Sequence, residues 1–111
     1  MTNINQEEWR DLISNDSSAV IIDCRSSLEW RRGIIKNSKL INLLNPNGFM
    51  NEAEKLDKEK NYYIYCRSGI RSITACQILE SLGVKKTYNL LGGIMSWKGE
   101  IVSPSEINNT N

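Results

Sequence analysis

The chain has 111 residues, which is the usual length of a single domain. Its 14 Lys and Arg residues against 13 Asp and Glu residues leave a formal charge of +1, so no basic surface is expected that would favour nucleic acid or an anionic membrane as a partner. Histidine is absent and the three cysteines form no CxxC pair, which excludes imidazole bases, Cys2His2 zinc sites and a disulfide framework.

Helix and strand signals alternate along the chain. In chain order, the first half predicts a helix over residues 6–14, a strand over 19–22, a short helical segment that starts after Ser26 or Ser27 and stops at Gly33, a strand over 40–43, and a turn over 45–48. The second half predicts helical spacing from Phe49 to Leu56, a strand over 62–65, a helix from Ile70 that Gly83 closes, a last short strand over 87–90, and a short helix to Lys98. This alternation predicts an α/β domain with a mainly parallel central sheet that is flanked by helices on both faces.

The predicted domain covers residues 1–102, and the polar residues 103–111 are expected to form a C-terminal tail. The N-terminal segment has neither the basic nor the apolar region of a signal peptide, and the longest purely aliphatic stretch is residues 19–22. With an odd number of cysteines, this favours a cytoplasmic protein that does not span a membrane.

The strongest chemical signal follows the strand predicted over 62–65. Cys66 leaves this strand into a short glycine-containing loop, and a helix begins directly after it. Backbone N–H groups of such a loop would point at the sulfur with the helix dipole behind them, which makes a cradle for an anion. Arg67 and Arg71 add positive potential that lowers a thiol pKa and favours the nucleophilic thiolate. Cys66 is therefore a candidate nucleophile, and a small buried core cysteine is the alternative interpretation.

Two other predicted strands also end in polar or glycine-rich sequence, Asp23-Cys24-Arg25 and Leu91-Gly92-Gly93. In a parallel α/β sheet the ligand site lies at these carboxyl ends. Arg25 could line such a site with Asp23 orienting an arginine, but an ion pair that tethers the loop is the preferred interpretation. Cys24 is interpreted as filling an aliphatic position, with a role as resolving thiol for Cys66 as the alternative. Cys76 is interpreted as a packed side chain of the helix.

Three motifs in this order resemble the rhodanese-like sulfurtransferases. The similarity covers Asp23-Cys24-Arg25 with Glu29-Trp30 and Gly33, then the active loop Cys66-Arg67-Ser68-Gly69-Ile70-Arg71-Ser72, and finally Leu91-Gly92-Gly93-Ile94-Met95-Ser96-Trp97. The chain departs from the family where a histidine usually follows Gly33, because Ile34 stands there.

The resemblance implies an enzyme that moves sulfane sulfur from a donor such as thiosulfate or a persulfide to a thiophilic acceptor. Cys66 would carry the sulfur as a persulfide, and Asp23 and Arg25 would support the loop. The residues implied to hold the donor or the persulfide are Arg67, Ser68, Gly69, Ile70, Arg71 and Ser72. The implied partners are a small-molecule or protein-bound sulfur donor and a thiol or cyanide acceptor, with no cofactor and no metal.

Two alternative functions remain open. Cysteine phosphatases and arsenate-reductase-like enzymes use a similar loop with Cys-x5-Arg spacing, whereas Cys66 and Arg71 have Cys-x4-Arg spacing, and the tighter loop suits a single sulfur better than a tetrahedral phosphate. A non-catalytic binding module could share the fold, since fold alone does not imply activity. Such modules most often lose the cysteine, and this chain retains it.

Overall fold

The central sheet consists of five strands that all run in the same direction. A computed structural model describes residues 1–104 of the chain. The strands are β1 (Thr2–Ile4), β2 (Ala19–Asp23), β4 (Ser38–Leu40), β5 (Asn61–Tyr65) and β6 (Lys86–Leu90), in the order β1-β6-β5-β2-β4. Every pairing between neighbours is parallel. The predicted α/β fold is confirmed, and the carboxyl ends of the strands share one edge of the sheet.

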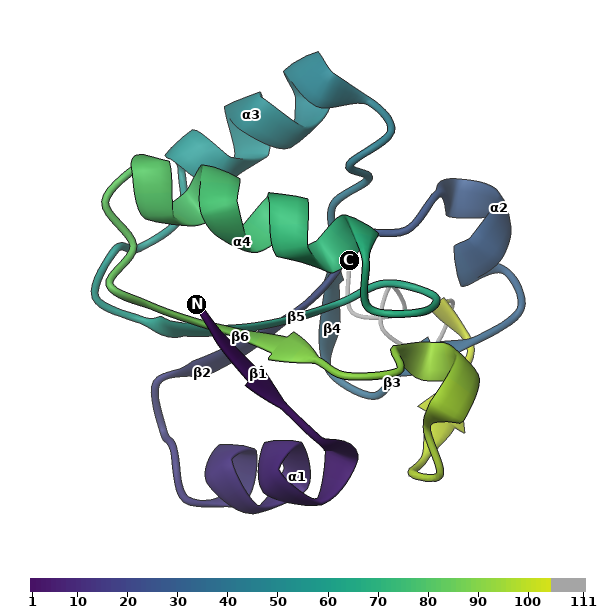
Figure 1. The fold of residues 1–111 in the computed structure, drawn as a ribbon. Helices are drawn as coiled ribbons and strands as arrows, with labels where there is room; N and C mark the ends of the chain where they lie inside the picture. Colours follow the sequence, from purple (N-terminus) through teal and green to yellow (C-terminus); the bar gives the residue numbers. More distant parts are fainter. Residues whose placement is uncertain (105–111) are drawn as a thin grey trace.

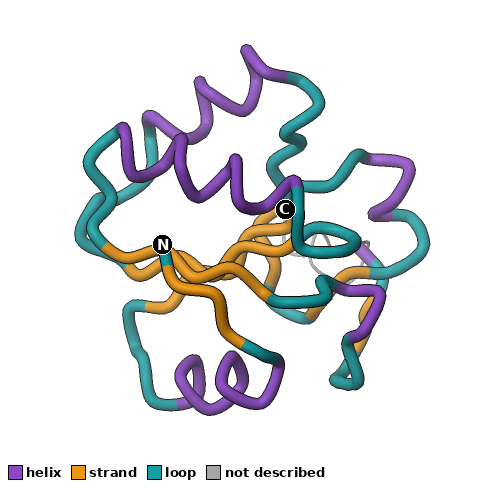
Figure 2. Tube along the Cα trace, viewed as in Figure 1, coloured by secondary structure: helices purple, strands orange, loops and turns teal. Residues whose placement is uncertain are grey.

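Helices cover both faces of this sheet, as predicted. Figures 1 and 2 show α3 (Pro46–Glu54) and α4 (Arg71–Ser81) on one face and α1 (Gln6–Ser14) on the other. The short helix α2 (Ser27–Trp30) and the 3-10 turn η1 (Ile94–Ser96) lie toward the carboxyl edge (Figure 1). The short strands β3 (Ile34–Ile35) and β7 (Ile101–Val102) form a separate antiparallel pair.

The side chains of β5 explain why helices cover both faces of the sheet. Successive side chains of a strand point to opposite faces. Tyr62 and Ile64 belong to the core beneath α3 and α4, whereas Tyr63 and Tyr65 belong to the core beneath α1. All four are at most 1% exposed, and burying a side chain of this size stabilises the fold by about 1.5–3 kcal/mol. An uncovered face would leave two of these side chains in water.

The helix predicted over residues 6–14 is confirmed together with the reason for its start. The side chain of Asn5 accepts a hydrogen bond from the Glu8 N–H at 2.9 Å, and the Glu8 carboxylate accepts one from the Asn5 N–H at 3.2 Å. These two bonds satisfy N–H groups that have no partner inside the helix.

The turn predicted over residues 45–48 is wrong, because this segment is the start of α3. Asn45 is the N-terminal cap, and its side-chain oxygen accepts a hydrogen bond from the Gly48 N–H at 3.3 Å. Pro46 occupies the first helical turn, where the missing N–H costs nothing. Asn-Pro sequences are typical of both turns and helix starts. Here the burial of Phe49 and Ala53 in the core stabilises the helix.

Several strand predictions also differ from the structure. The strand predicted over 40–43 lies at 38–40, although the N–H groups of Ile41 and Leu43 still donate to carbonyls of residues 23 and 24 beside β2. The strands β1, β3 and β7 are not predicted, so residues 87–90 are not the last strand. The helix predicted to reach Lys98 is the 3-10 turn η1. Strands of two or three residues carry little local signal and depend on partners far along the chain.

No helix within residues 1–104 is long and apolar enough to cross a membrane. Residues 105–111, most of the predicted tail, lie outside the described residues. The domain boundary at residue 102 therefore stays a prediction.

Candidate active site

Cys66 lies at the carboxyl end of β5 and opens the Cys66 loop, residues 66–72, which leads into α4. Its sulfur accepts hydrogen bonds from the N–H groups of Gly69 at 3.2 Å and Ser72 at 3.4 Å. The Ser72 hydroxyl lies 3.3 Å from the same sulfur. Cys66 is 1% exposed, so these donors replace water as its hydrogen-bonding environment.

The carbonyls of the loop are bonded to its surroundings, which leaves its N–H groups free to face the sulfur. The Cys66 carbonyl accepts from the Ile94 N–H, and the Arg67 carbonyl accepts from the Met95 N–H, each at 3.0 Å. The Gly69 carbonyl accepts from the Asn89 side-chain amide at 3.1 Å. Gly69 has a φ of +96°, a conformation that favours glycine. The loop is thus held in the conformation that directs its amides inward.

Gly93 explains why the glycine pair after β6 is needed next to this loop. Its φ is +59°, and a Cβ atom at this position would overlap the carbonyl oxygen of Arg67. The absence of a side chain therefore lets η1 approach closely enough for the two hydrogen bonds to the Cys66 loop. Gly92-Gly93, which the sequence suggested as part of the binding site, instead allows η1 to bind the carbonyl side of the Cys66 loop.

The electrostatic environment favours ionised Cys66. Burial opposes ionisation, but hydrogen bonds from the Ser72 hydroxyl and from the N–H groups of Ser72, Gly69 and Ser68 outweigh it, so the pKa of Cys66 lies below its ordinary value. The N-terminus of α4, which begins at Arg71, adds a favourable dipole for negative charge. Cys66 is therefore a thiol prepared to act as a nucleophile.

Arg71 is held by an acidic partner rather than pointing freely into the site. Its guanidinium donates two hydrogen bonds to the Glu29 carboxylate, at 2.9 and 2.8 Å. This pairing holds the pKa of Glu29 at about 2, and the same carboxylate raises the pKa of Arg71. Ser26 also donates to Glu29, which fixes the carboxylate at the start of α2. Part of the positive charge of Arg71 is therefore neutralised.

The remaining predicted loop residues divide into two groups. The N–H groups of Ser68, Gly69 and Ser72 surround the sulfur. Arg67 and Ile70 instead face solvent, and Ile70 is 73% exposed. The Arg67 side chain has no hydrogen bond or ion pair with any residue in the described part of the chain. An exposed cation and an exposed apolar side chain therefore lie on the rim of the site.

Asp23 and Arg25 form the ion pair that was the preferred interpretation of their sequence. The closest approach is 2.7 Å, and Arg25 also donates to the Gly33 carbonyl at 2.8 Å. The Tyr65 hydroxyl donates to Asp23 at 2.8 Å and accepts from the Ile35 N–H at 3.0 Å. Asp23 is 0% and Arg25 5% exposed. This buried network ties the segment around β3 to β2 and β5.

The sequence interpretation missed Asn89 as part of the site. Asn89 is 1% exposed on β6, its side-chain oxygen accepts from the Ser72 hydroxyl, and its amide donates to the carbonyl of Gly69 and to the side chain of Asn3. It thereby orients both the hydroxyl and the loop beside Cys66. An asparagine inside the strand predicted over 87–90 was the available signal, because a buried amide requires partners.

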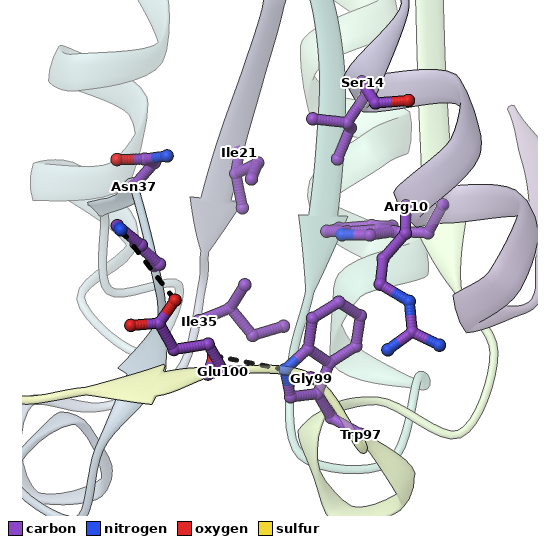
Figure 3. A pocket seen from close by; sticks show the side chains of 11 residues that line it. Arg10, Ser14, Ile21, Ile35, Asn37, Trp97, Gly99 and Glu100 are labelled. Atoms are coloured by element: carbon purple, nitrogen blue, oxygen red, sulfur yellow. Dashed lines mark hydrogen bonds and ion pairs between the residues drawn. The ribbon is translucent and has the colours of Figure 1, made fainter.

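A separate hollow of about 270 Å³ lies beside α1 (Figure 3). Its walls include Trp9, Ile13 and Trp97, and the Arg10 guanidinium lies 5.3 Å from the centre of the Trp97 ring. No residue of the Cys66 loop lines this hollow. Within residues 1–104, no group of three or more acidic, cysteine or histidine side chains is placed to hold a metal ion.

The fold and the site together define a class of protein: an α/β domain that presents a cysteine sulfur to loop N–H groups at the carboxyl end of a parallel strand. The family model described as "Rhodanese-like domain" matches residues 5–100. The chain belongs to this family, as its motifs implied.

Similar proteins from several organisms carry sulfurtransferase names. YtwF of Bacillus subtilis (strain 168), named as a sulfurtransferase, is 36% identical over 97 residues, which cover 87% of this chain and 90% of YtwF. A mitochondrial protein of Schizosaccharomyces pombe named as a thiosulfate sulfurtransferase is 38% identical, over 81% of this chain and 70% of its own length. The crystal structure of a rhodanese-like domain protein from Staphylococcus aureus has a TM-score of 0.78 and 29% identity, and the match covers 93% of this chain and 98% of that one.

Proposed function

We propose that this chain is a sulfurtransferase that moves sulfane sulfur from a donor to a thiophilic acceptor through a persulfide on Cys66. The observation that carries the proposal is the ring of donors around the sulfur, formed by two N–H groups and a hydroxyl at 3.2–3.4 Å. This ring favours a thiolate without a neighbouring base, in a chain that contains no histidine. The sulfurtransferase names of the relatives support the same reaction class.

The first half-reaction with thiosulfate loads the enzyme. The Cys66 thiolate attacks the outer sulfur of thiosulfate, a new S–S bond forms, and the original S–S bond breaks with its electron pair leaving on sulfite. In the second half-reaction a thiolate or cyanide attacks the same outer sulfur, and Cys66 recovers its electron pair as a thiolate. Neither step needs a general base at Cys66, because negative charge passes from one sulfur to the next within reach of the same N–H groups.

The donor enters from the rim that Arg67 and Arg71 share. Arg67 is exposed and has no partner among the described residues, so it is free to pair with the oxygen atoms of an anionic donor. Arg71 contributes less attraction, because Glu29 already accepts two of its hydrogen bonds. The short Cys-x4-Arg loop suits a single sulfur atom better than a tetrahedral phosphate, which favours sulfur transfer over phosphoester hydrolysis.

Intact mass spectrometry of the reduced protein tests this function. Thiosulfate, a low-molecular-weight persulfide or a protein persulfide should each be offered separately, and at least one should add the mass of a sulfur atom that cyanide then removes. Cys66→Ser should gain no sulfur. Cys76→Ser is the matched control and should load normally, because Cys76 is also buried in the core but lies outside the Cys66 loop.

Two results would contradict the proposal. The first is sulfur loading of Cys66→Ser at the rate of the wild-type protein. The second is a wild-type protein that gains no sulfur from any donor, and hydrolysis of aryl phosphates by this protein would then favour a phosphatase. A folded protein with neither activity would indicate a binding module.

A further inference from the structure

The pairing of β2 with β5 places Cys24 and Cys66 side by side. Asp23 lies opposite Tyr65 in the parallel register, and the N–H of Cys24 continues the ladder by donating to the Tyr65 carbonyl at 3.1 Å. Cys24 and Cys66 directly follow the last residues of the two strands. Neighbouring strands lie about 4.8 Å apart, so the same register carried on by one residue places the two Cα atoms about 5 Å from each other. This falls inside the range of roughly 4.4–6.8 Å found in disulfides.

The two cysteine side chains also point to the same face of the sheet. The side chains of Asp23 and Tyr65 meet beneath α1, where the Tyr65 hydroxyl donates to Asp23 at 2.8 Å. Side-chain direction alternates along a strand, so the next residues turn to the opposite face. Cys24 and Cys66 accordingly belong to one core cluster beneath α3 and α4, and both are at most 1% exposed. Figure 1 shows β2 and β5 beneath these helices.

We propose that Cys24 is a resolving thiol that closes a disulfide with Cys66 after a hydroperoxide has oxidised Cys66. In the first step the Cys66 thiolate takes the hydroxyl oxygen of the hydroperoxide, the O–O bond breaks, and the alkoxide or hydroxide that leaves is protonated by solvent. In the second step Cys24 attacks the sulfenic sulfur, the S–O bond breaks, and the hydroxyl group leaves as water with the proton of the Cys24 thiol. The two cysteines together lose two electrons to the hydroperoxide.

The environment of Cys24 keeps its thiol protonated while Cys66 is ionised. Burial raises the pKa of the Cys24 thiol, and the nearby charge of Cys66 raises it further, so Cys24 stays protonated while Cys66 is a thiolate. A sulfenic acid on Cys66 carries no such charge and removes that second contribution. Cys24 therefore does not compete for sulfur in the ordinary cycle, and oxidation of Cys66 removes the smaller of these two contributions to its raised pKa.

This reaction gives the protein a reversible inactive state. The disulfide occupies the Cys66 sulfur, so sulfur loading stops until a dithiol reductant opens the bond. Without a resolving thiol, further peroxide would convert the sulfenic acid to sulfinic and sulfonic acids, which a dithiol does not reduce. The proposal is separate from the sulfurtransferase function, because it requires only that Cys66 reacts as a thiolate.

Hydrogen peroxide treatment of the reduced 111-residue protein tests the proposal. The wild-type monomer should lose the mass of two hydrogen atoms, and peptide mapping without reductant should join the peptides that contain Cys24 and Cys66. Dithiothreitol should restore the original mass completely. Cys24→Ser should instead gain two or three oxygen atoms on Cys66, and dithiothreitol should not remove them.

Cys76→Ser is the matched control and should behave as the wild type does. Cys76 is as buried as Cys24, its pKa is raised to about 12 by burial, and it lies on α4 rather than on a neighbouring strand. A thermal melt checks that each variant is folded, and Cys24→Val replaces Cys24→Ser if the serine is not tolerated in the core.

Three results would overturn the proposal: a wild-type protein without the Cys24 to Cys66 peptide, a crosslink of Cys66 to Cys76, or a folded Cys24 variant that dithiothreitol restores as fully as the wild type. Sulfur loading of the untreated protein is measured in parallel. A protein that loads sulfur but forms no crosslink contradicts only the resolving role. A protein that forms the crosslink but never loads sulfur contradicts only the sulfurtransferase function.

Discussion

Replacing Ser72 with alanine removes the hydroxyl 3.3 Å from the Cys66 sulfur and leaves the Ser72 N–H in place. We expect the pKa of Cys66 to rise, because a donor to the thiolate is lost. A hydrogen bond to a charged group contributes roughly 1.5–3 kcal/mol, and one pKa unit corresponds to about 1.4 kcal/mol. Complete loss of this bond would therefore raise the pKa of Cys66 by about one to two units.

Asn89 reduces the expected shift, because its side-chain oxygen accepts the same Ser72 hydrogen. In the thiol state Cys66 can donate to the Ser72 oxygen while Ser72 donates to Asn89. In the thiolate state the Ser72 hydrogen turns toward the sulfur, and Asn89 loses that partner. The gain at the sulfur is partly offset, so the expected shift is about one pKa unit. The variant should also lose about 1–3 kcal/mol in its free energy of unfolding, because the buried oxygen of Asn89 is left without a donor.

The pH dependence of Cys66 alkylation by iodoacetamide measures this pKa, with the modified peptide identified by mass spectrometry. The midpoint should lie below the ordinary thiol pKa in the wild type and higher in Ser72→Ala. Ser68→Ala is the matched control, since its side chain is exposed and its N–H group, which remains, faces the sulfur. An unchanged midpoint in Ser72→Ala, or an equal shift in Ser68→Ala, would refute the argument. Urea unfolding of the same variants gives the stability change.

Three further substitutions test the charged residues. Glu29 has a pKa of about 2 in the folded protein against an ordinary 4.5, so the stability that its ionised form contributes is present above pH 4.5 and is lost as the pH falls toward 2. Glu29→Gln should therefore flatten the decline of Tm over this pH range. An equally steep decline in the variant would contradict the pairing with Arg71. Arg71→Ala leaves the Glu29 carboxylate unpaired beside the site, so kcat/KM for thiosulfate should fall about tenfold or more while a thermal melt still shows a folded protein; unchanged kinetics would remove Arg71 from the site. Asp23→Asn leaves the buried Arg25 without a charged partner, so the free energy of unfolding measured in urea should fall by about 3–5 kcal/mol. Sulfur loading per folded molecule should stay the same if the ion pair only tethers the fold.

The amino-acid sequence alone determined those helices and strands whose signals come from residues close together in the chain. Asn5 and Glu8 are three residues apart and cap the helix that follows, so its start could be predicted from the sequence. The aromatic run before Cys66 and the helix that begins directly after the loop placed the cysteine at a strand end, where parallel sheets hold their sites. Short-range signals were also misleading where one pattern suits two structures, as Asn45-Pro46 does.

Only the tertiary structure decided which side chains meet. Arg71 and Glu29 are 42 residues apart in the chain, and Ser72 and Asn89 are 17 apart. No local pattern could therefore show that the first two residues form an ion pair and the other two a hydrogen bond. The same holds for Cys24 and Cys66, because a shift of one residue in the register of β2 and β5 would turn one sulfur to the opposite face. Such contacts depend on strand order, register and burial, which arise from the packing of the whole domain rather than from neighbouring residues.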